Sequence, residues 1–274
     1  MRAKTMAVIA IVPGLLGLAG CGLDGLEGFG RVGKDFHYSY PLQSGGRISV
    51  ETFNGSVEIT GWDQEMVDIS GTKYGPSPEA ADALAIEITH TPEAVGIRAV
   101  RPSDFSGNRG ARFLIRIPRK AVVDTVQTSN GGIQVMDGAG PARLRTSNGG
   151  IRVEDFTGTV EARTSNGGIH ARLAAGGGAP VRLETSNGGV DLELPPQFSD
   201  DVRVHTSNGP ITLRWPGATN ARVRADTSNA SITTDFEVKT QGSLGRNHLD
   251  GTIGTGGPLV DLTTSNGGIR LLKM

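Results

Sequence analysis

Charged side chains recur at fixed distances before a repeated threonine, and their types are those that bind ligands. Arginine stands three residues before three consecutive copies of that threonine, and Glu, His or Asp stands one residue before it. The resulting patch comprises Arg182, Arg203, Arg224, Glu184, His205 and Asp226. Guanidinium groups bind carboxylates, sulfates and phosphates through paired donors. We therefore expect the patch to bind an anionic glycan or a lipid headgroup, unless its carboxylates pair with its arginines as a solvated lattice.

The same patch contains two carboxylates that an enzyme could use. Glu184 and Asp226 stand two repeats apart, or about 9.6 Å if consecutive repeats are neighbouring strands. Inverting glycosidases place their two carboxyl groups at about this separation. The sequence contains no nucleophile elbow, phosphate-binding loop or cysteine cluster, and its five histidines are scattered. We therefore expect no catalytic residues, metal or cofactor, with a polysaccharide-active enzyme as the alternative.

A short motif repeats along the second half of the chain. Thr-Ser-Asn-Gly-Gly followed by Ile or Val begins at residues 128, 146, 164, 185 and 264, and looser copies begin at Thr206 and Thr227. The copies up to Thr227 are 18 or 21 residues apart, and His248–Ile253 is a degenerate copy in the gap that follows. Apolar and polar residues alternate on both sides of each motif, which is typical of a strand with one buried face. We therefore expect residues 120–274 to form an all-β solenoid (a β-helix) of 18–21-residue coils stacked in chain order.

The motif is expected to form a corner between the two strands of each coil. Its Thr and Asn are in phase with the buried residues, so both should lie inside the corner, where Asn amides of adjacent coils can bond to one another. The glycines supply the backbone freedom that a tight corner requires. The expected corner ladder comprises Asn130, Asn148, Asn166, Asn187, Asn208, Asn229 and Asn266. An ice-binding or other surface array, a further alternative, would need these side chains to face water.

The beginning of the chain has the pattern of an export signal. Arg2 and Lys4 precede an apolar stretch, residues 6–18, that is too short for a permanent membrane span. Leu18-Ala-Gly-Cys21 resembles the lipobox of bacterial lipoproteins, which implies cleavage before Cys21 and a diacylglycerol thioether on its sulfur. Gly22, where Asp would imply retention at the inner membrane, implies an envelope location at the outer membrane if the cell has one, facing the periplasm or the surface.

Three segments carry a resemblance to a known family. The chain resembles the bacterial "putative adhesin" family of unknown function in these segments. They are Phe113-Leu-Ile-Arg-Ile-Pro118, the run from Asp124 through the first full motif, and Gly251–Ile269. The resemblance extends over residues 45–272. It implies a β-solenoid envelope protein, a non-enzymatic binding or scaffolding module whose partner would be a glycan or another envelope protein.

Composition and the remaining segments complete the expected organisation. Glycine is abundant at 41 residues, aromatic residues make up 5%, and the net charge is −1, which suits a narrow aliphatic core and excludes nucleic acid as the main partner. We expect a signal peptide over residues 1–20, a Gly-rich tether over 21–34, an irregular β cap over 35–119 and the solenoid over 120–274. Ser77 before Pro78 predicts a helical turn within the cap.

Overall fold

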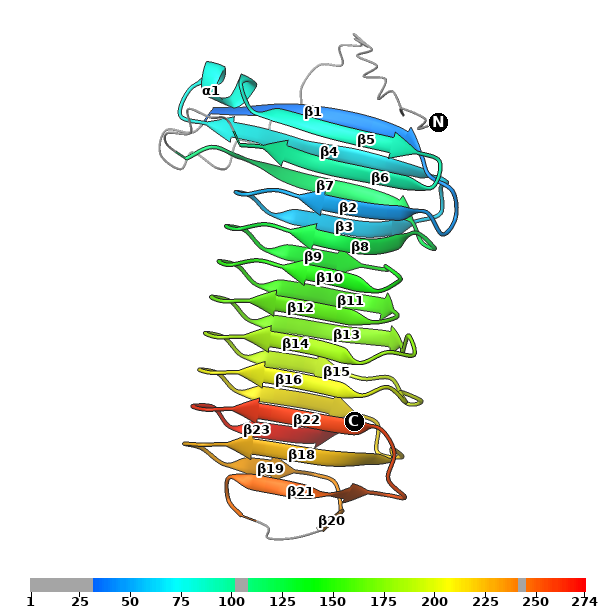
Figure 1. Cartoon of the computed structure of the whole chain (residues 1–274), viewed down its shortest axis with the longest axis vertical. Coiled ribbons are helices and arrows are strands. Elements are labelled where there is room, and N and C mark those ends of the chain that lie inside the picture. Colours follow the sequence, from blue (N-terminus) through cyan, green and yellow to red (C-terminus); the bar gives the residue numbers. More distant parts are fainter. Residues whose placement is uncertain (1–31, 102–107, 241–244) are drawn as a thin grey trace, which may run out of the picture.

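The computed structural model describes residues 32–101, 108–240 and 245–274 as an elongated column built from two β-sheets (Figure 1). Within these residues, the first sheet has eleven strands. Their order is β1 (Val32–Pro41), β4 (Met66–Gly75), β7 (Gly110–Pro118), β3 (Val57–Trp62), β9 (Ile133–Met136), β11 (Ile151–Thr157), β13 (Ile169–Ala175), β15 (Val190–Glu193), β17 (Ile211–Trp215), β23 (Ile269–Lys273) and β19 (Ile232–Thr234).

The second sheet has twelve strands within the same described ranges. Their order is β20 (Val238–Thr240), β21 (His248–Ile253), β18 (Ala221–Thr227), β22 (Leu259–Thr264), β16 (Val202–Thr206), β14 (Val181–Thr185), β12 (Val160–Thr164), β10 (Ala142–Arg145), β8 (Val122–Gln127), β2 (Arg47–Glu51), β6 (Ala94–Val100) and β5 (Ala85–Thr91). The one helix in the described ranges, α1 (Pro78–Asp82), is short, and no helix there is long and apolar enough to cross a membrane.

Each coil contributes one strand to each sheet, and equivalent strands pair in parallel. In β14, for example, Val181 and Leu183 are buried while Arg182 and Glu184 are exposed, and β14 pairs in parallel with β12 and β16. The inward side chains of both sheets form one continuous hydrophobic core. The expected all-β solenoid with coils of 18–21 residues is therefore confirmed, because strands with one apolar face are stable only when two such faces are packed together.

The threonine of each motif is buried and bonds to the adjacent coil. Thr185 is 1% exposed, and its hydroxyl donates to the carbonyl oxygen of Gly167 at 2.8 Å. Equivalent bonds join Thr206 to Gly188 and Thr164 to Gly149 at the same distance. An ice-binding surface made from these threonines is thus contradicted, since their hydroxyl groups are inside the corner and already occupied.

The asparagines form a ladder, but on the outside of the corner. The Nδ2 group of Asn187 donates to Oδ1 of Asn166 at 2.9 Å, and Asn208 donates to Asn187 at 2.9 Å. The same side-chain bond continues along the column through Asn54, Asn130, Asn148, Asn166, Asn187, Asn208, Asn266 and Asn229. All members after Asn54 are exposed, so the expectation that they lie inside is wrong. The strand ends at Thr, and the alternation of faces ends with it.

The two glycines of the motif differ in what surrounds them. A Cβ on the first glycine would lie 2.1 Å from a backbone carbonyl oxygen of the preceding coil, as for Gly167 against Gly149. A Cβ on the second, Gly168, would lie 3.3 Å from the carbonyl oxygen of Gly189. In coils with a neighbour on both sides, the first position therefore favours glycine for close backbone approach, and the second tolerates a side chain. Ser56 and Pro210 indeed stand at the second position in other coils. Ala230 stands at the first position only in the coil whose strand β19 is at the edge of its sheet.

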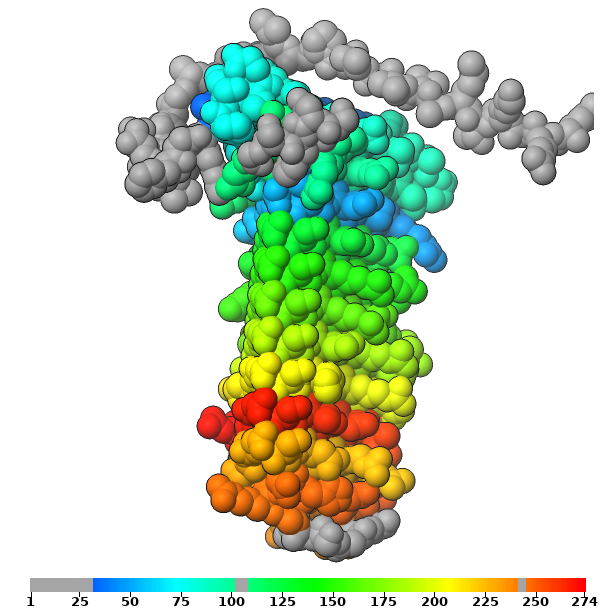
Figure 2. Space-filling view, turned by 60° about the vertical axis from the view of Figure 1, so that its left-hand side comes forward, coloured from blue at the N-terminus to red at the C-terminus, as the bar shows by residue number. Residues whose placement is uncertain are grey.

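The coils do not stack in chain order near the C-terminal end. β22 and β23 pair with β16 and β17 on one side and with β18 and β19 on the other, although β18 and β19 precede them in the chain. Figure 2 shows this inserted coil as a red band between yellow and orange coils. His248–Ile253 is not a degenerate coil, because β21 runs antiparallel to β18 and β20 at the end of the sheet. Both expectations of sequential stacking are therefore wrong.

The N-terminal region covers the opposite end of the column. β2 and β3 form a coil that stacks in parallel on β8 and β9, within the residues expected to be an irregular cap. Beyond that coil, β1, β4 and β7 pair in antiparallel fashion, as do β5 and β6. The predicted helical turn is present as α1, with the Ser77 side chain accepting from the Ala80 N–H. β1 begins at Val32, inside the stretch expected to be a tether.

Candidate functional site

A groove of about 630 Å³ follows the corner along the eleven-stranded sheet. It crosses six adjacent strands, β3, β9, β11, β13, β15 and β17, a length of about 24 Å at ordinary strand spacing. Its lining includes the second corner residue of each coil, namely Ser56, Gly132, Gly150, Gly168, Gly189 and Pro210. Four of these six have no side chain, which leaves the groove open at the position where a Cβ would project.

The groove is also lined by outward side chains that stand two residues after the second corner residue of each coil. They are Glu58, Gln134, Arg152, His170, Asp191 and Thr212. Because successive strands pair in register, these side chains form one row that offers both hydrogen-bond donors and acceptors. Nearby partners hold several of them, since Arg152 lies 2.7 Å from Glu154, and Asp191 contacts both Arg214 and His170. The row is polar, nearly balanced in charge and contains no Phe, Tyr or Trp.

The predicted arginine patch is divided by the inserted coil. Arg182 and Arg203 are direct neighbours on β14 and β16, but Asp261 of β22 lies between Arg203 and Arg224. Among the described residues, none of the three arginines forms an ion pair, but Arg224 has an acidic neighbour on each side, Asp261 and Asp250, whereas Arg203 has one, Asp261. The three arginines are therefore not one column, and the two that are adjacent are the remaining candidates for binding an anion.

The other three patch residues are also separated. His205 lies between Glu184 and Thr263, not between Glu184 and Asp226. Glu184 pairs with Arg163 at 3.4 Å, and Asp226 lies 2.5 Å from Nδ1 of His248. Their carboxylates thus already have partners outside the patch.

The carboxylate pair of the enzyme alternative is too widely spaced. Glu184 and Asp226 are three strand steps apart, through His205 and Thr263, or about 14 Å at ordinary strand spacing. This distance exceeds the range of about 6.5–9.5 Å for inverting glycosidases. Nearby aromatic side chains cannot serve as sugar platforms, since Trp215, Phe198 and Phe156 are all buried.

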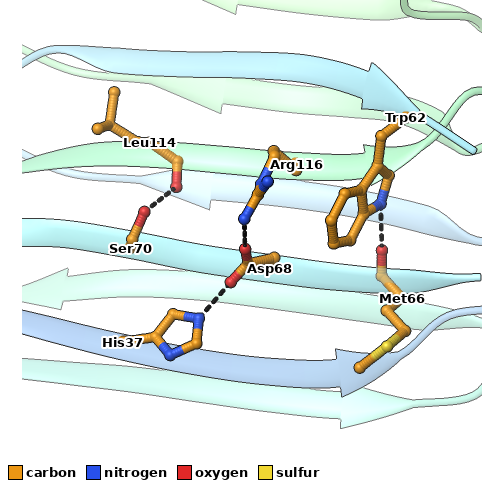
Figure 3. Close-up of polar contacts among 7 residues, drawn as sticks. All are labelled: His37, Trp62, Met66, Asp68, Ser70, Leu114 and Arg116. Carbon is orange, nitrogen blue, oxygen red and sulfur yellow. Dashed lines mark hydrogen bonds and ion pairs between the residues drawn. The ribbon is translucent and has the colours of Figure 1, made fainter. Parts of the chain in front are cut away.

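A buried carboxylate joins three strands of the N-terminal cap (Figure 3). Asp68 of β4, 7% exposed, accepts hydrogen bonds from His37 of β1 and Arg116 of β7. The Arg116 guanidinium lies 4.5 Å from the centroid of the Trp62 ring, and the Trp62 indole donates to the Met66 carbonyl oxygen at 2.8 Å. These contacts tie the edge strand β1 to the sheet. We name this group the Asp68 clasp.

The Asp68 clasp predicts a specific response to acid. Burial raises the pKa of Asp68, but hydrogen bonds and charges of His37 and Arg116 outweigh burial and hold its pKa below the ordinary value. A lowered folded pKa means that the clasp stabilises the protein above about pH 4, the pKa of an unfolded Asp, and that this stabilisation is lost as pH falls through the folded pKa. We expect Asp68→Asn to lower the free energy of unfolding at neutral pH by about 1–3 kcal/mol.

Urea unfolding at a series of pH values measures this effect. The free energy of unfolding of wild type should fall more steeply below pH 4 than that of Asp68→Asn. Asp35→Asn, a change in the exposed Asp of the same strand β1, is the matched control and should leave the wild-type acid slope in place. Parallel pH profiles for wild type and Asp68→Asn would contradict the role given to the clasp.

Two further expectations concern lipid attachment and metal binding. Cys21, the proposed lipid attachment site, lies outside the described residues. Across the described ranges, no group of three or more His, Cys, Asp or Glu side chains is placed to hold a metal ion. The groove itself was not anticipated from the sequence, although the recurring second glycine beside an outward polar residue was a visible signal.

Comparisons with known proteins place the chain in a family. No curated protein matches it. Solved structures that the chain resembles include a putative cell adhesion protein from Clostridium sporogenes, with 13% identity over 88% of this chain and 100% of that chain and a TM-score of 0.41. A putative adhesin from Bacteroides fragilis has 12% identity over 87% of this chain and 97% of that chain, with a TM-score of 0.37. Residues 48–213 match the family model described as Toastrack DUF4097. Since that match spans more than half of the sequence, the chain belongs to the Toastrack DUF4097 family.

Proposed function

We propose that this chain is a non-enzymatic binding module of the bacterial cell envelope, of adhesin type, that holds an extended polar polymer such as a glycan in the groove. The observation that carries the proposal is the groove itself, which continues over six strands beside a row of side chains that offer both hydrogen-bond donors and acceptors. An extended chain of hydroxyl groups offers the matching acceptors and donors at every step. The near balance of charge along the row favours a neutral or mixed-charge glycan over a strongly anionic one.

The spacing of carboxylates in the groove supports binding without turnover. Glu58 and Asp191 are the two carboxylates among its lining residues. They are four strand steps apart, or about 19 Å at ordinary strand spacing. Glycosidases need two carboxyl groups within about 9.5 Å of each other. Asp191 is in addition occupied by Arg214 and His170.

Filling the groove tests the proposal. In Gly150→Gln/Gly168→Gln, each new Cβ would lie 3.3 Å from a carbonyl oxygen, at a position that Ser or Pro occupies in other coils. The two side chains should occupy the groove and weaken glycan binding about tenfold or more, or about 1.4 kcal/mol. Binding is measured on a glycan array and then by calorimetry with the bound glycans.

The matched control places the same side chains at the same two corners but outside the groove. Ser147 and Ser165 are exposed and do not line it. Ser147→Gln/Ser165→Gln should therefore bind glycan as wild type does. Equal affinity of the groove-filled variant and wild type would move the binding site elsewhere, and release of reducing ends from a bound glycan would favour the polysaccharide-active enzyme.

The arginine pair supports a second, anionic ligand site. Arg182 and Arg203 are adjacent on the twelve-stranded sheet and form no ion pair among the described residues. Two guanidinium groups at strand spacing offer paired donors to sulfated or uronic-acid sugars. The variant Arg182→Ser/Arg203→Ser, tested on the same array, distinguishes the two sites. It should weaken the binding of acidic glycans only and flatten the salt dependence of that binding.

We further propose that Cys21 anchors the module in the membrane, at the outer membrane if the cell has one. The supporting observation is the Leu-Ala-Gly-Cys sequence after a charged and apolar leader. Detergent phase partitioning is the test: wild type should enter the detergent phase and Cys21→Ser the aqueous phase, because several acyl chains anchor a protein stably. Recovery of both proteins in the aqueous phase would refute the anchor.

A further inference from the structure

The inserted coil occupies a slot between coils that precede it in the chain. β16 and β17 form one side of the slot, and β18 and β19 form the other. The link from β17 to β18, residues 216–220, therefore passes over one full coil position. The inserted coil, β22 with β23, supplies Val260, Leu262, Ile269 and Leu271 to the core. Until residues 259–273 enter, the slot presents unpaired strand edges and unburied apolar side chains.

The inserted coil uses the same bonds as every ordinary coil. Thr264 donates to the Gly209 carbonyl oxygen at 3.0 Å, and Asn266 donates to Asn208 at 2.7 Å. On the far side, Thr227 donates to the Gly267 carbonyl oxygen at 2.9 Å, and Asn229 donates to Asn266 at 2.7 Å. The slot thus selects for a strand–corner–strand unit of this repeat, whichever polypeptide supplies it.

Charge makes residues 259–273 the repeat unit that fits. Asp261 lies between Arg203 and Arg224, whereas direct contact of the two flanking coils would place those arginines side by side. Like charges on directly opposed residues of neighbouring strands are unfavourable. The stack already contains one such pair, Arg182 and Arg203, and Asp261 prevents a second from forming beside it. The equivalent position in other coils of this chain is occupied by Thr125, Arg143, Glu161, Arg182 or Arg203. An acid there is therefore uncommon among the copies.

The connection to the inserted coil has the features of a hinge. It runs from the end of β21 at Ile253 to the start of β22 at Leu259. Gly254 and Gly256 within it have φ angles of 61° and 84°, which are backbone conformations that glycine adopts at little cost. A segment joined through such a link can separate from the stack as a unit while β21 stays paired to β18.

We propose that the slot is a strand-receptor site that exchanges the inserted coil between two copies of this chain. Residues 259–273 of one copy fill the slot of the second, and those of the second fill the slot of the first. Every Thr, Asn and core contact is then restored across the exchange, so the swapped pair retains the interactions of the monomer. The exchange takes place during folding, when coils on both sides are formed and the slot is still empty.

Co-refolding of full-length chains tests the exchange. Two populations with different affinity tags are unfolded together in denaturant and refolded at increasing concentration, all carrying Cys21→Ser so that engineered cysteines are the only ones. The locked chain also carries His205→Cys/Thr263→Cys, which joins neighbouring residues of β16 and β22. Directly paired positions on neighbouring strands lie within the reach of a disulfide. The disulfide is formed in the folded protein before unfolding, so each locked chain must refill its own slot.

A matched control chain carries Glu184→Cys/His205→Cys, which joins β14 to β16 and leaves the inserted coil free. Sequential capture on both tags followed by native mass spectrometry counts mixed dimers. We expect unlocked and control chains to form mixed dimers that increase with concentration, and the oxidised locked chain to form about tenfold fewer. Reduction should restore them. Equal yields from locked and unlocked chains, or no mixed dimers from any chain, would overturn the proposal.

Discussion

Gly167→Ala should destabilise the protein by about 3 kcal/mol, because overpacking against backbone cannot be relieved by a side-chain rotation. The added Cβ would lie 2.1 Å from the Gly149 carbonyl oxygen. That oxygen also accepts the Thr164 hydroxyl at 2.8 Å, so a shift that relieves the clash disturbs the corner of the preceding coil as well. The free energy of unfolding in urea measures the loss.

Gly168→Ala, one residue along in the same corner, is the matched control. Its Cβ would lie 3.3 Å from the Gly189 carbonyl oxygen, and other coils have Ser or Pro at this position. We expect a change within about 1 kcal/mol. Similar losses for both variants would show that glycine is needed in the corner for general flexibility and not for close backbone approach at one position.

Removal of residues 259–274 should cost on the order of 6 kcal/mol or more, which is comparable with the whole stability of many domains. The segment buries Val260, Leu262, Ile269 and Leu271 in the core. Because it lies between two coils, its loss also exposes strand edges on both sides of the slot. We expect the shortened chain to lose its single cooperative unfolding transition, as followed by circular dichroism during urea titration.

A chain that lacks only Met274 is the control for this deletion. Met274 is 53% exposed and lies beyond β23, and its N–H donates to the Trp215 carbonyl oxygen at 3.0 Å, so its removal should cost about 1 kcal/mol or less. If the larger deletion were equally mild, the coil would not be an internal part of the stack. The same deletion at a peripheral end of a solenoid would remove one strand pairing on each sheet instead of two.

The sequence was sufficient to predict the solenoid because its evidence is local. The alternation of apolar and polar residues around each motif determines which face of a strand is buried, as in Val181 and Leu183 of β14. The same residue types recur at intervals of 18 or 21 residues, and equivalent residues of neighbouring coils lie side by side. The helical turn after Ser77 was predictable for the same reason, since a cap and a proline act within a few residues.

The position of the asparagines was misjudged because strand periodicity does not extend into a corner. Thr185 ends β14 and is buried, but Asn187, two residues later, is exposed. Past the last strand residue the chain turns, and side chains no longer alternate between two faces. The ladder of amides depends on coil spacing alone, so it forms on the outside of the corner as readily as on the inside.

The order of the coils and the groove were decided by tertiary structure. Copies of one motif offer nearly identical bonds, so the motif alone does not say which copy lies beside which, and the free energy of the whole stack selects β22 as the neighbour of β16. That choice places Asp261 beside Arg203 and separates Glu184 from Asp226, which removes both the arginine column and the carboxylate pair expected from chain order. The groove likewise exists only once the second glycines of successive coils are aligned. Sequence therefore determined the shape of each coil through local periodicity, whereas long-range pairing determined which coils meet and hence which side chains can act together.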